Sequence, residues 1–204
     1  MRLYWHPFSI VPRRVRIAVR EKGLACEEHA VDLPGGALRS DAFRRLNPFG
    51  QVPVLEDGTL VVAESIAILE YLEERYPTPA LLPRDTAARA IARQYMLWSG
   101  DYLLPAWKQW MAPFFAPGVT RDAPAVQQAR LDFTTHLDVL EAQLTGGEYL
   151  LGGFSLADIC YAPFVTTMEL TGLGDLLPDR PAVRAWVERL ADRPAVRDTA
   201  PAPI

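Results

Sequence analysis

The stretch at residues 47–65, NPFGQVPVLEDGTLVVAES, constrains the fold of this chain more than any other segment. Pro53 stands just ahead of an apolar run, and proline fits the first residue of a strand because it has no amide hydrogen to donate to the ladder. Asp57-Gly58 separates this run from a second one at residues 60–63, and this dipeptide is typical of a type I′ hairpin turn. The segment therefore predicts two antiparallel strands joined by a tight turn.

Glu64 and Ser65 follow the second predicted strand and precede the helical sequence IAILEYLEERY. Ser65 is suited to cap that helix, because a serine oxygen accepts a hydrogen bond from a first-turn amide. The free amides and the helix dipole at such a start favour anions. The segment is therefore either an ordinary hairpin with a capped helix or part of a binding site, and its residues alone leave both readings open.

Composition narrows the class of protein. Half of the 204 residues are hydrophobic and 23% are charged, as in a soluble globular protein. The net charge of −4 argues against a nucleic-acid partner, for which a basic domain would be expected. No apolar run approaches the ~20 residues that span a membrane. The N-terminal sequence lacks the apolar core of a secretory signal, so we expect a cytoplasmic protein.

Metal chemistry has no support in the sequence. Cys26 and Cys160 are far apart and fit neither a CxxC motif nor zinc-ligand spacing. The three histidines, His6, His29 and His136, are scattered along the chain. We therefore expect no metal site.

The first 77 residues alternate between strand and helix patterns. The predicted elements are a strand at 3–5, a helix with Pro12 in its first turn and Gly23 at its end, a strand at 26–31 and a short helix at 41–46 capped by Ser40. With the hairpin and the helix after it, the order is β-α-β-α-β-β-α. That order predicts an α/β thioredoxin-like domain over residues 1–77, with a mixed sheet covered by helices.

The rest of the chain reads as a linker and an all-α domain. Residues 78–86 contain prolines without periodicity and are interpreted as the linker, and residues 87–204 as the helical domain. The predicted helices are 86–115, 124–144, 155–170 and 181–191, and Pro105 should kink or split the first. Ser155 and Asp158 form the sequence of a capping box, which we assign to folding and not to chemistry.

Three motifs resemble the cytosolic glutathione transferases. NPFGQVPVLEDG followed by Glu64-Ser65 is similar to that family's glutathione-binding segment, and FSLADICYAP looks like the capping motif of its helical domain. SIVPRRVRIA, which begins at Ser9, resembles the serine-type classes (phi, tau, theta and zeta). The resemblance covers nearly the whole chain and implies a thioredoxin-like N-terminal domain followed by an all-helical C-terminal bundle.

The resemblance implies that Ser9 is the catalytic residue. Its hydroxyl would donate a hydrogen bond to the glutathione thiolate beside the start of a helix. Free thiols titrate at about 8.5, so lowering that pKa by two units requires roughly 2.7 kcal/mol of preferential thiolate stabilisation. One charged hydrogen bond, worth about 1.5–3 kcal/mol, could supply most of it. The alternative is an ordinary loop serine near a helix start.

The resemblance also implies the main contacts to glutathione. The backbone of Val52 would pair with the cysteinyl part like an added strand, and Pro53 would be the family's cis-proline. Glu64 would accept the γ-glutamyl ammonium, and Ser65 would bind the adjacent carboxylate with its hydroxyl and amide.

Two further contacts would serve the glycyl end of glutathione. Gln51 would reach the ligand backbone or that end, and Arg39 matches a lysine that faces the glycyl carboxylate in the phi and tau patterns. The position before it, often histidine in phi enzymes, is Leu38 here, and an exposed arginine is more often only a solvated surface group.

A second, hydrophobic substrate would bind between the two domains. Aromatic residues crowd the predicted helix at 86–115, a pattern that more often belongs to a core or a dimer interface than to a pocket, although an aromatic cleft at a domain boundary is where an apolar ligand would bind. The candidate pocket residues are Phe8, Val11, Trp107, Trp110 and Met111.

The sequence therefore predicts a glutathione S-transferase that activates glutathione, as a co-substrate and without a further cofactor, for attack on a small hydrophobic electrophile. The resemblance implies a homodimer, whereas the net charge and the lengths of the apolar runs argue against a nucleic-acid or a membrane partner. One alternative is another glutathione-dependent enzyme on this fold, an isomerase, dehalogenase or peroxidase. Ser9-Ile10-Val11 departs from the Ser-Ser-Cys run of zeta-class isomerases, which weakens isomerisation. Another alternative is a non-catalytic binding module.

Overall fold

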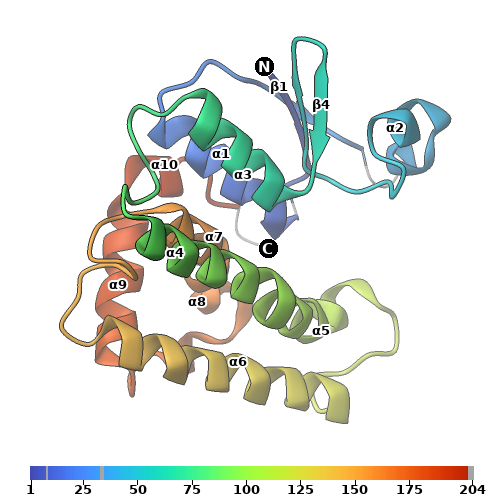
Figure 1. Cartoon of the computed structure of the whole chain (residues 1–204). Coiled ribbons are helices and arrows are strands. Elements are labelled where there is room, and N and C mark those ends of the chain that lie inside the picture. Colours follow the sequence, from blue (N-terminus) through green and yellow to red (C-terminus); the bar gives the residue numbers. More distant parts are fainter. Residues whose placement is uncertain (8, 33–34, 202–204) are drawn as a thin grey trace. The chain divides into compact units, whose positions relative to one another are not determined.

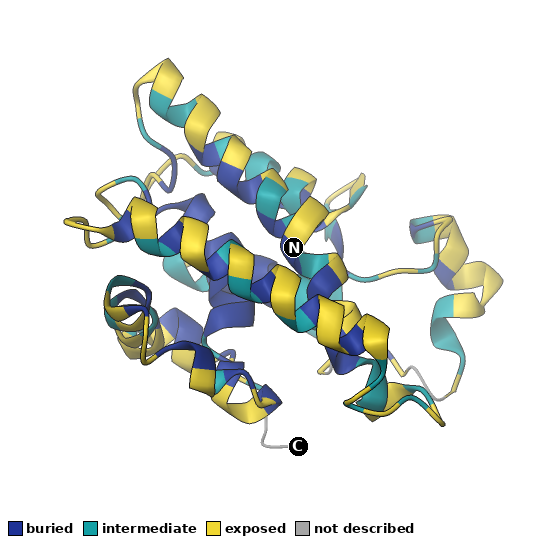
Figure 2. Cartoon of the chain, turned by 90° about the horizontal axis from the view of Figure 1, so that it is seen from below, coloured by how far each residue is buried: buried dark blue, intermediate teal, exposed yellow. Residues whose placement is uncertain are grey.

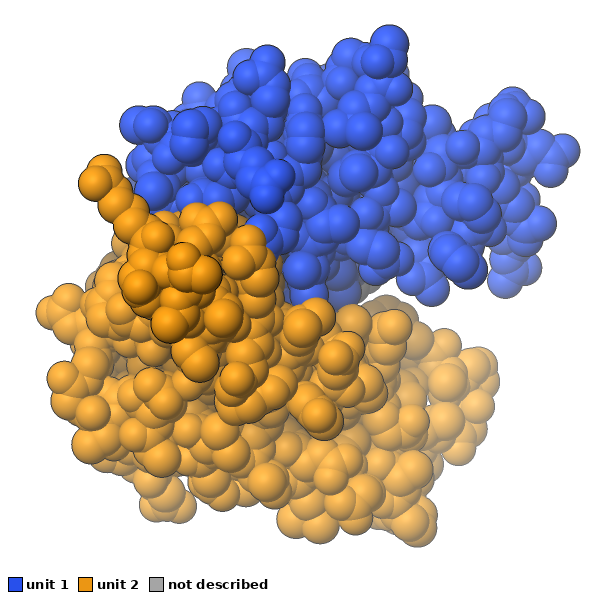
Figure 3. Space-filling model, in the orientation of Figure 1, with its two compact units in different colours: residues 1–81, 194–202 blue, residues 82–193, 203–204 orange. Residues whose placement is uncertain are grey.

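The computed structural model describes residues 1–7, 9–32 and 35–201, which form two compact units (Figure 3). The N-terminal unit contains Met1–Leu81 together with the short helix α10 (Pro194–Arg197), and the C-terminal unit contains Leu82–Arg193. Arg13 explains the assignment of α10, because its Nη2 donates to the carbonyl of Val196 at 3.0 Å. The unit boundaries differ from the predicted domains, since the first unit extends past residue 77 and includes α10.

A four-stranded mixed sheet forms the centre of the N-terminal unit. Its strands are β1 (Arg2–Trp5), β2 (Glu27–Ala30), β3 (Val54–Asp57) and β4 (Leu60–Ala63). They lie in the order β2-β1-β3-β4, with β1 parallel to β2 and antiparallel to β3, and with β3 antiparallel to β4. The predicted strands and the mixed sheet are confirmed.

The turn of the hairpin differs from the prediction. Asp57 pairs with Leu60, so the two loop residues are Gly58 and Thr59. Gly58 has a φ of 62°, whereas Glu64 is the only described residue other than glycine with a positive φ. A positive φ at the first loop position alone is the pattern of a type II′ turn. The hairpin prediction is confirmed, and the type I′ assignment is wrong.

Helices cover both faces of this sheet. α1 (Ile10–Glu21) and α3 (Ser65–Arg75) lie side by side on one face (Figure 1). On the other face, Phe43 of α2 (Asp41–Leu46) packs with Val31 and Val54 in a buried cluster. The predicted cap of α2 is confirmed, because the Ser40 side chain accepts a hydrogen bond from the Phe43 amide. A 3-10 turn, η1 (Ala37–Arg39), precedes α2.

The C-terminal unit is helical, as predicted. Its elements are α4 (Thr86–Trp98), the π-helical segment η2 (Ser99–Leu103), α5 (Leu104–Phe115), α6 (Pro124–Leu144), α7 (Leu156–Val165), α8 (Met168–Thr171), the 3-10 turn η3 (Gly174–Leu176) and α9 (Pro181–Asp192). The predicted helix at 86–115 is split by η2, directly before the turn that holds Pro105. The predicted helix at 155–170 ends at Val165.

The core of this unit forms where helices bury one side. Figure 2 shows helices with exposed residues along one side and buried residues along the other. In α6 the buried residues follow the three-to-four spacing of an amphipathic helix. They are Val126, Ala129, Phe133, Leu137, Leu140 and Leu144. α7 is buried at every residue and forms the centre of the unit. Within the described ranges, no helix is both long and apolar enough to cross a membrane.

The predicted capping box at the start of α7 is confirmed and extends further than its two residues. Oδ2 of Asp158 accepts hydrogen bonds from the Ser155 amide and hydroxyl, both at 2.9 Å. Oδ1 accepts from the Leu150 amide at 3.1 Å and the Trp186 indole at 3.0 Å. Burial raises the pKa of the Asp158 carboxyl, and these donors oppose the rise. Asp158 therefore joins α7, α9 and the preceding loop.

Candidate active site

The pairing of the sheet brings the predicted glutathione contacts together at one end. Tyr4 near the end of β1 pairs with Val54, the first residue of β3, and Val54 pairs with Ala63, the last residue of β4. The loop after β1, the segment before β3 and the segment after β4 therefore leave the sheet at the same end. These three segments carry Ser9, Val52-Pro53 and Glu64-Ser65.

Ser9 is the N-cap residue of α1, with an extended backbone at φ −94° and ψ 116°. Its amide donates to the carbonyl of His6 at 3.0 Å, which closes the loop from β1. Its hydroxyl makes no capping hydrogen bond to any residue that the structure describes. Ser9 is half-buried. Its hydroxyl therefore lies at the positive end of α1 but is not used in a capping hydrogen bond.

Val52 lies just outside the β3–β4 ladder, which begins at the Val54–Ala63 pair. The peptide bond between Val52 and Pro53 is cis, as expected. Val52 is half-buried and packs against the cluster around Phe43, while Pro53 is buried. The backbone of Val52 therefore has the position of an extra residue at the end of a strand.

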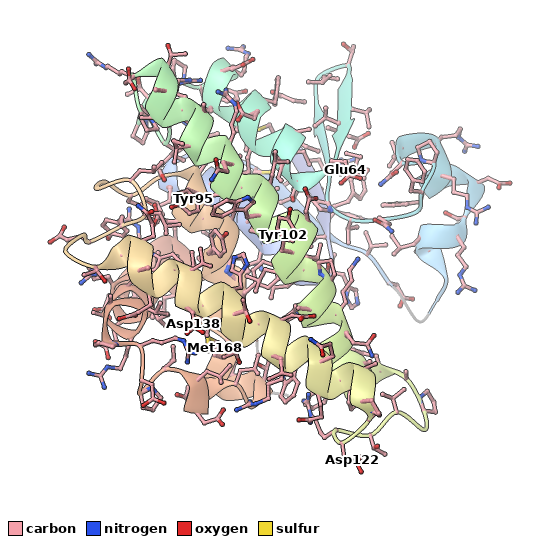
Figure 4. All side chains as sticks on the ribbon, turned by 60° about the horizontal axis from the view of Figure 1, so that its bottom comes forward. Glu64, Tyr95, Tyr102, Asp122, Asp138 and Met168 are labelled. Carbon is pink, nitrogen blue, oxygen red and sulfur yellow. The ribbon has the colours of Figure 1, made fainter. Side chains whose placement is uncertain are left out.

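Glu64 lies at the junction of β4 and α3 with its side chain exposed (Figure 4). Its backbone has φ 70° and ψ 116°, in a region that residues with a side chain rarely adopt. Such a conformation costs about 1–3 kcal/mol and is usually held by its surroundings at functional positions. Glu64 is also the N-cap residue of α3, and Ser65 is the first helical residue. The prediction that Ser65 caps this helix is therefore wrong by one position.

Ser65 is buried and contacts a second helix. Its Oγ accepts a hydrogen bond from Nη1 of Arg14 at 3.4 Å, and only 1% of Arg14 is exposed. This contact joins α1, which begins after Ser9, to the first residue of α3. The helix that follows Ser9 and the helix that begins at Ser65 are therefore linked by a side-chain hydrogen bond.

Arg39 and Gln51 are both exposed, at neighbouring parts of the loop region beside α2. The carbonyl of Gln51 accepts a hydrogen bond from Nδ2 of Asn47 at 2.8 Å. Gly50 has a φ of 60°, and a Cβ there would lie 2.6 Å from the carbonyl oxygen of Leu38. Only glycine permits this approach, which holds the segments that carry Arg39 and Gln51 against each other.

The predicted hydrophobic-substrate residues lie in different parts of the chain. Phe8 lies outside the described residues, and Val11 is half-buried in the first turn of α1. In α5, Trp107 packs edge-on against Phe164, with ring centroids 5.7 Å apart. Nε1 of Trp110 donates to the carbonyl of Thr171 at 2.9 Å. Met111 is buried. These contacts are those of a helical core, and a role in substrate binding stays a prediction.

No group of three or more histidine, cysteine, aspartate or glutamate side chains gathers as a metal site among residues 1–7, 9–32 and 35–201. Burial lowers the pKa of His6, whose carbonyl receives the Ser9 amide.

Sequence reasoning missed two features of the site. One is Arg14, which is buried. The sequence hints at this only by placing a charged residue among the apolar positions of the helix. The other is the positive φ of Glu64, which no residue type at that position suggests, because glycine is the usual sign of such a backbone.

Comparison with known proteins agrees with this architecture. Residues 3–80 match the family described as "Glutathione S-transferase, N-terminal domain", and residues 123–189 match "Glutathione S-transferase, C-terminal domain". Glutathione S-transferase F10 of Arabidopsis thaliana is 33% identical over 199 residues, which cover 94% of this chain and 93% of that protein.

Solved structures give the same result. Glutathione transferase F7 from Populus trichocarpa is 30% identical and superposes with a TM-score of 0.89, covering 97% of this chain and 96% of that one. A glutathione transferase from Burkholderia graminis, solved with two glutathione molecules bound per subunit, is 30% identical with a TM-score of 0.85 over 97% of this chain and 86% of that one. With both of its domains matched and a relative aligned over nearly its full length, this chain belongs to the glutathione S-transferase family.

Proposed function

We propose that this chain binds glutathione at the end of its sheet, ionises the thiol beside Ser9 and transfers the resulting thiolate to a small hydrophobic electrophile. The observation that carries the proposal is the meeting of three segments at one end of the sheet. The loop with Ser9, the Val52-Pro53 segment and the Glu64-Ser65 junction are joined there by the Tyr4–Val54 and Val54–Ala63 pairs.

Each part of glutathione has a matching group in this arrangement. The exposed carboxylate of Glu64 suits the γ-glutamyl ammonium, and the hydroxyl and amide of Ser65 suit the carboxylate beside it. The backbone of Val52 suits the cysteinyl amide and carbonyl groups, because Val52 lies just beyond the end of the β3–β4 ladder and its groups are not used in that ladder. The exposed side chains of Arg39 and Gln51 suit the glycyl end.

Ser9 then faces the sulfur of the bound tripeptide. A hydroxyl that does not cap its helix can donate its proton to a thiolate, and the dipole of α1 favours negative charge at the same place. A shift of two units in the thiol pKa requires roughly 2.7 kcal/mol, which one charged hydrogen bond and a helix start can provide together. Ser9 acts on the nucleophile and is not the nucleophile itself.

The electrophile, the assembly and the location are further parts of the proposal. Val11 and the aromatic residues of α5 are the candidates for contacts to the electrophile, together with Phe8. Holding the two reactants side by side would supply much of the rate. We also expect a homodimer, as the family resemblance implies, and a cytoplasmic location, where reduced glutathione is available.

The experiment that tests the proposal combines glutathione binding by calorimetry with the ultraviolet absorbance of the bound thiolate against pH. The variants are Ser9→Ala, Glu64→Ala and, as a matched control, Ser40→Ala. Ser40 is also an N-cap serine of the N-terminal unit, but its hydroxyl is engaged with the Phe43 amide of α2. We expect wild type and Ser40→Ala to bind glutathione and lower its thiol pKa, Ser9→Ala to bind without that shift, and Glu64→Ala to lose affinity.

Other outcomes separate the alternatives. Absence of glutathione binding by the wild type contradicts the proposal and favours a non-catalytic binding module. Binding with an unshifted thiol contradicts the role of Ser9. Binding and ionisation without turnover of aryl halides, but with turnover of a peroxide or a halogenated alkane, favours another glutathione-dependent reaction on this fold.

A further inference from the structure

Arg14 lies in the middle of α1 and is almost completely buried, with 1% of its surface exposed. Its Nη1 lies 3.4 Å from Oγ of Ser65, the first residue of α3. Burying a guanidinium costs free energy unless its donors are satisfied, so an arginine at this position calls for a reason. Its contact with a residue of the proposed glutathione site gives one.

The direction of this hydrogen bond determines what the Ser65 hydroxyl can do. A serine hydroxyl has one proton to donate and two lone pairs that accept. Since Arg14 has donors only, the Ser65 oxygen must accept in this contact, and its own proton stays available for a third group. A nearby positive charge also polarises the hydroxyl and makes it a stronger donor in a site of low dielectric.

The surroundings of Ser65 favour an anion as that third group. Ser65 begins an eleven-residue helix, whose first amides have no partner within the helix. Hydrogen-bond donors from this helix start and the charge of Arg14 behind the hydroxyl act in the same direction. Glu64, one residue earlier, is exposed and carries the opposite charge. The pair of positions therefore complements a zwitterion, the ammonium and carboxylate of an α-amino acid.

We propose that Arg14 is a positioning residue that holds the Ser65 hydroxyl with its proton directed at the α-carboxylate of the γ-glutamyl group and stabilises that carboxylate by its charge. The inference rests on the proposed glutathione site. Arg14 acts through Ser65, because its buried guanidinium is not exposed for direct contact with a ligand.

Arg13 provides a matched control in the same helix. It is also buried, with 5% exposed, but its guanidinium donates to the carbonyl of Val196 at 3.0 Å and to Oγ1 of Thr199 at 3.4 Å. Successive residues of a helix point about 100° apart, which explains why the two arginines reach different elements. Loss of either side chain removes a buried guanidinium, but only Arg14 contacts Ser65.

The test measures the affinity of each variant for two ligands by calorimetry. One ligand is glutathione, and the other is γ-aminobutyryl-cysteinyl-glycine, which is glutathione without the γ-glutamyl α-carboxylate. The variants are Arg14→Gln, Arg14→Lys, Ser65→Ala and the control Arg13→Gln. We expect Arg14→Gln to bind glutathione about tenfold more weakly and the decarboxylated ligand within about twofold of wild type.

The remaining variants sharpen the assignment. Arg14→Lys keeps a charge but not the fork that reaches Ser65, so we expect a loss of about threefold for glutathione and none for the decarboxylated ligand. In a Ser65→Ala background, Arg14→Gln should cause a smaller loss than in wild type, because the two residues act together. Arg13→Gln should leave the preference between the two ligands unchanged.

Equal weakening of both ligands by Arg14→Gln would assign Arg14 to folding alone and overturn the inference. If Arg14→Gln does not fold, equal weakening by Arg14→Lys, or no weakening of either ligand, contradicts the inference in the same way. A wild type that does not bind glutathione contradicts the proposed function itself. A wild type that binds both ligands equally contradicts the carboxylate contact while leaving the thiol chemistry of Ser9 intact.

Discussion

The ammonium of Lys22, at the end of α1, lies 2.7 Å from Oε2 of Glu73 in α3, and both side chains are buried. The same Nζ donates to the carbonyls of Tyr76 and Pro79, each at 2.8 Å. Both carboxylate oxygens of Glu73 accept from the amide of Leu81, at 3.1 and 3.0 Å. This ion pair therefore fastens the segment after α3 to the N-terminal unit, which explains why the unit extends to Leu81.

Breaking this pair should be strongly destabilising. Glu73→Gln leaves the buried ammonium of Lys22 without its counter-charge, so we expect the free energy of unfolding to fall by about 3–5 kcal/mol. Denaturation by urea measures the change, and Glu74→Gln, at an exposed position of the same helix, should alter stability by less than about 0.5 kcal/mol. A Glu73→Gln protein as stable as its control would show that the pair does not hold the segment.

The double variant Lys22→Met/Glu73→Leu separates the effect of an unpaired charge from the effect of losing the hydrogen bonds that these side chains make to the backbone. Replacing both ions by apolar side chains removes the unpaired charge, which alone can restore stability. Here the amide of Leu81 and the carbonyls of Tyr76 and Pro79 lose these side-chain partners together. We therefore expect the double variant to recover only part of the loss, and full recovery would contradict the importance of those backbone contacts.

Glu64 should combine a binding role with backbone strain. Glu64→Ala and Glu64→Gly both remove the carboxylate and should weaken glutathione binding equally, whereas only glycine adopts φ 70° without strain. We expect Glu64→Gly to be more stable than Glu64→Ala by about 1 kcal/mol, as measured by urea denaturation. Equal stabilities would contradict the strain, and wild-type affinity in either variant would contradict the contact to the ammonium.

Asp158 should be the most sensitive polar residue of the C-terminal unit. Asp158→Asn places an amide NH₂ against two of the four donors that the carboxylate now satisfies, so we expect a loss of about 3 kcal/mol. Ser155→Ala removes the hydroxyl donor but leaves the other three contacts, and should cost about 1 kcal/mol. Thermal and urea denaturation would test whether Asp158→Asn loses more stability than Ser155→Ala. The opposite ranking would show that the Ser155 hydroxyl, and not the Asp158 carboxylate, supplies most of the stabilisation.

Local patterns in the sequence predicted most elements because each depends on near neighbours. The bounds of α6 match the predicted helix at 124–144, since its amphipathic pattern and closing glycines lie within the segment. The hairpin was also predicted, but its turn type was not, because the pairing of Asp57 with Leu60 decides which two residues form the loop. The split of the helix at 86–115 followed from Pro105, whereas the π-helical form of residues 99–103 did not.

The sequence predicted which segments form the site, but it did not predict the contacts that hold those segments in place. Ser9, Val52 and Glu64 lie on segments that the sheet pairing brings to one end, and motif resemblance identified them. The contact between Arg14 and Ser65 joins residues 51 positions apart, so it depends on how α1 and α3 pack. The start of α3 was misplaced by one residue because the backbone angle of Glu64, and not the capping preference of Ser65, ends the loop.

His136 should make the C-terminal unit sensitive to acid. Its Nε2 lies 3.0 Å from the hydroxyl of the buried Tyr161, and burial lowers the pKa of its imidazole from 6.5 to about 4. Between these two pH values the unfolded chain binds the proton and the folded chain does not, so stability falls as the pH drops through this window. A shift of this size corresponds to at most about 3 kcal/mol, which is fully present above pH 6.5.

The comparison of wild type with His136→Gln tests this prediction, because glutamine can still bond to Tyr161 but does not titrate. Urea denaturation at several pH values between 4 and 6.5 should show wild type losing up to about 3 kcal/mol relative to the variant as the pH falls. His29→Gln, at an exposed position of β2, is the matched control and should follow wild type. If the profiles of wild type and His136→Gln stay parallel, the imidazole is protonated as easily in the folded chain as in the unfolded one, and the acid sensitivity must come from other groups.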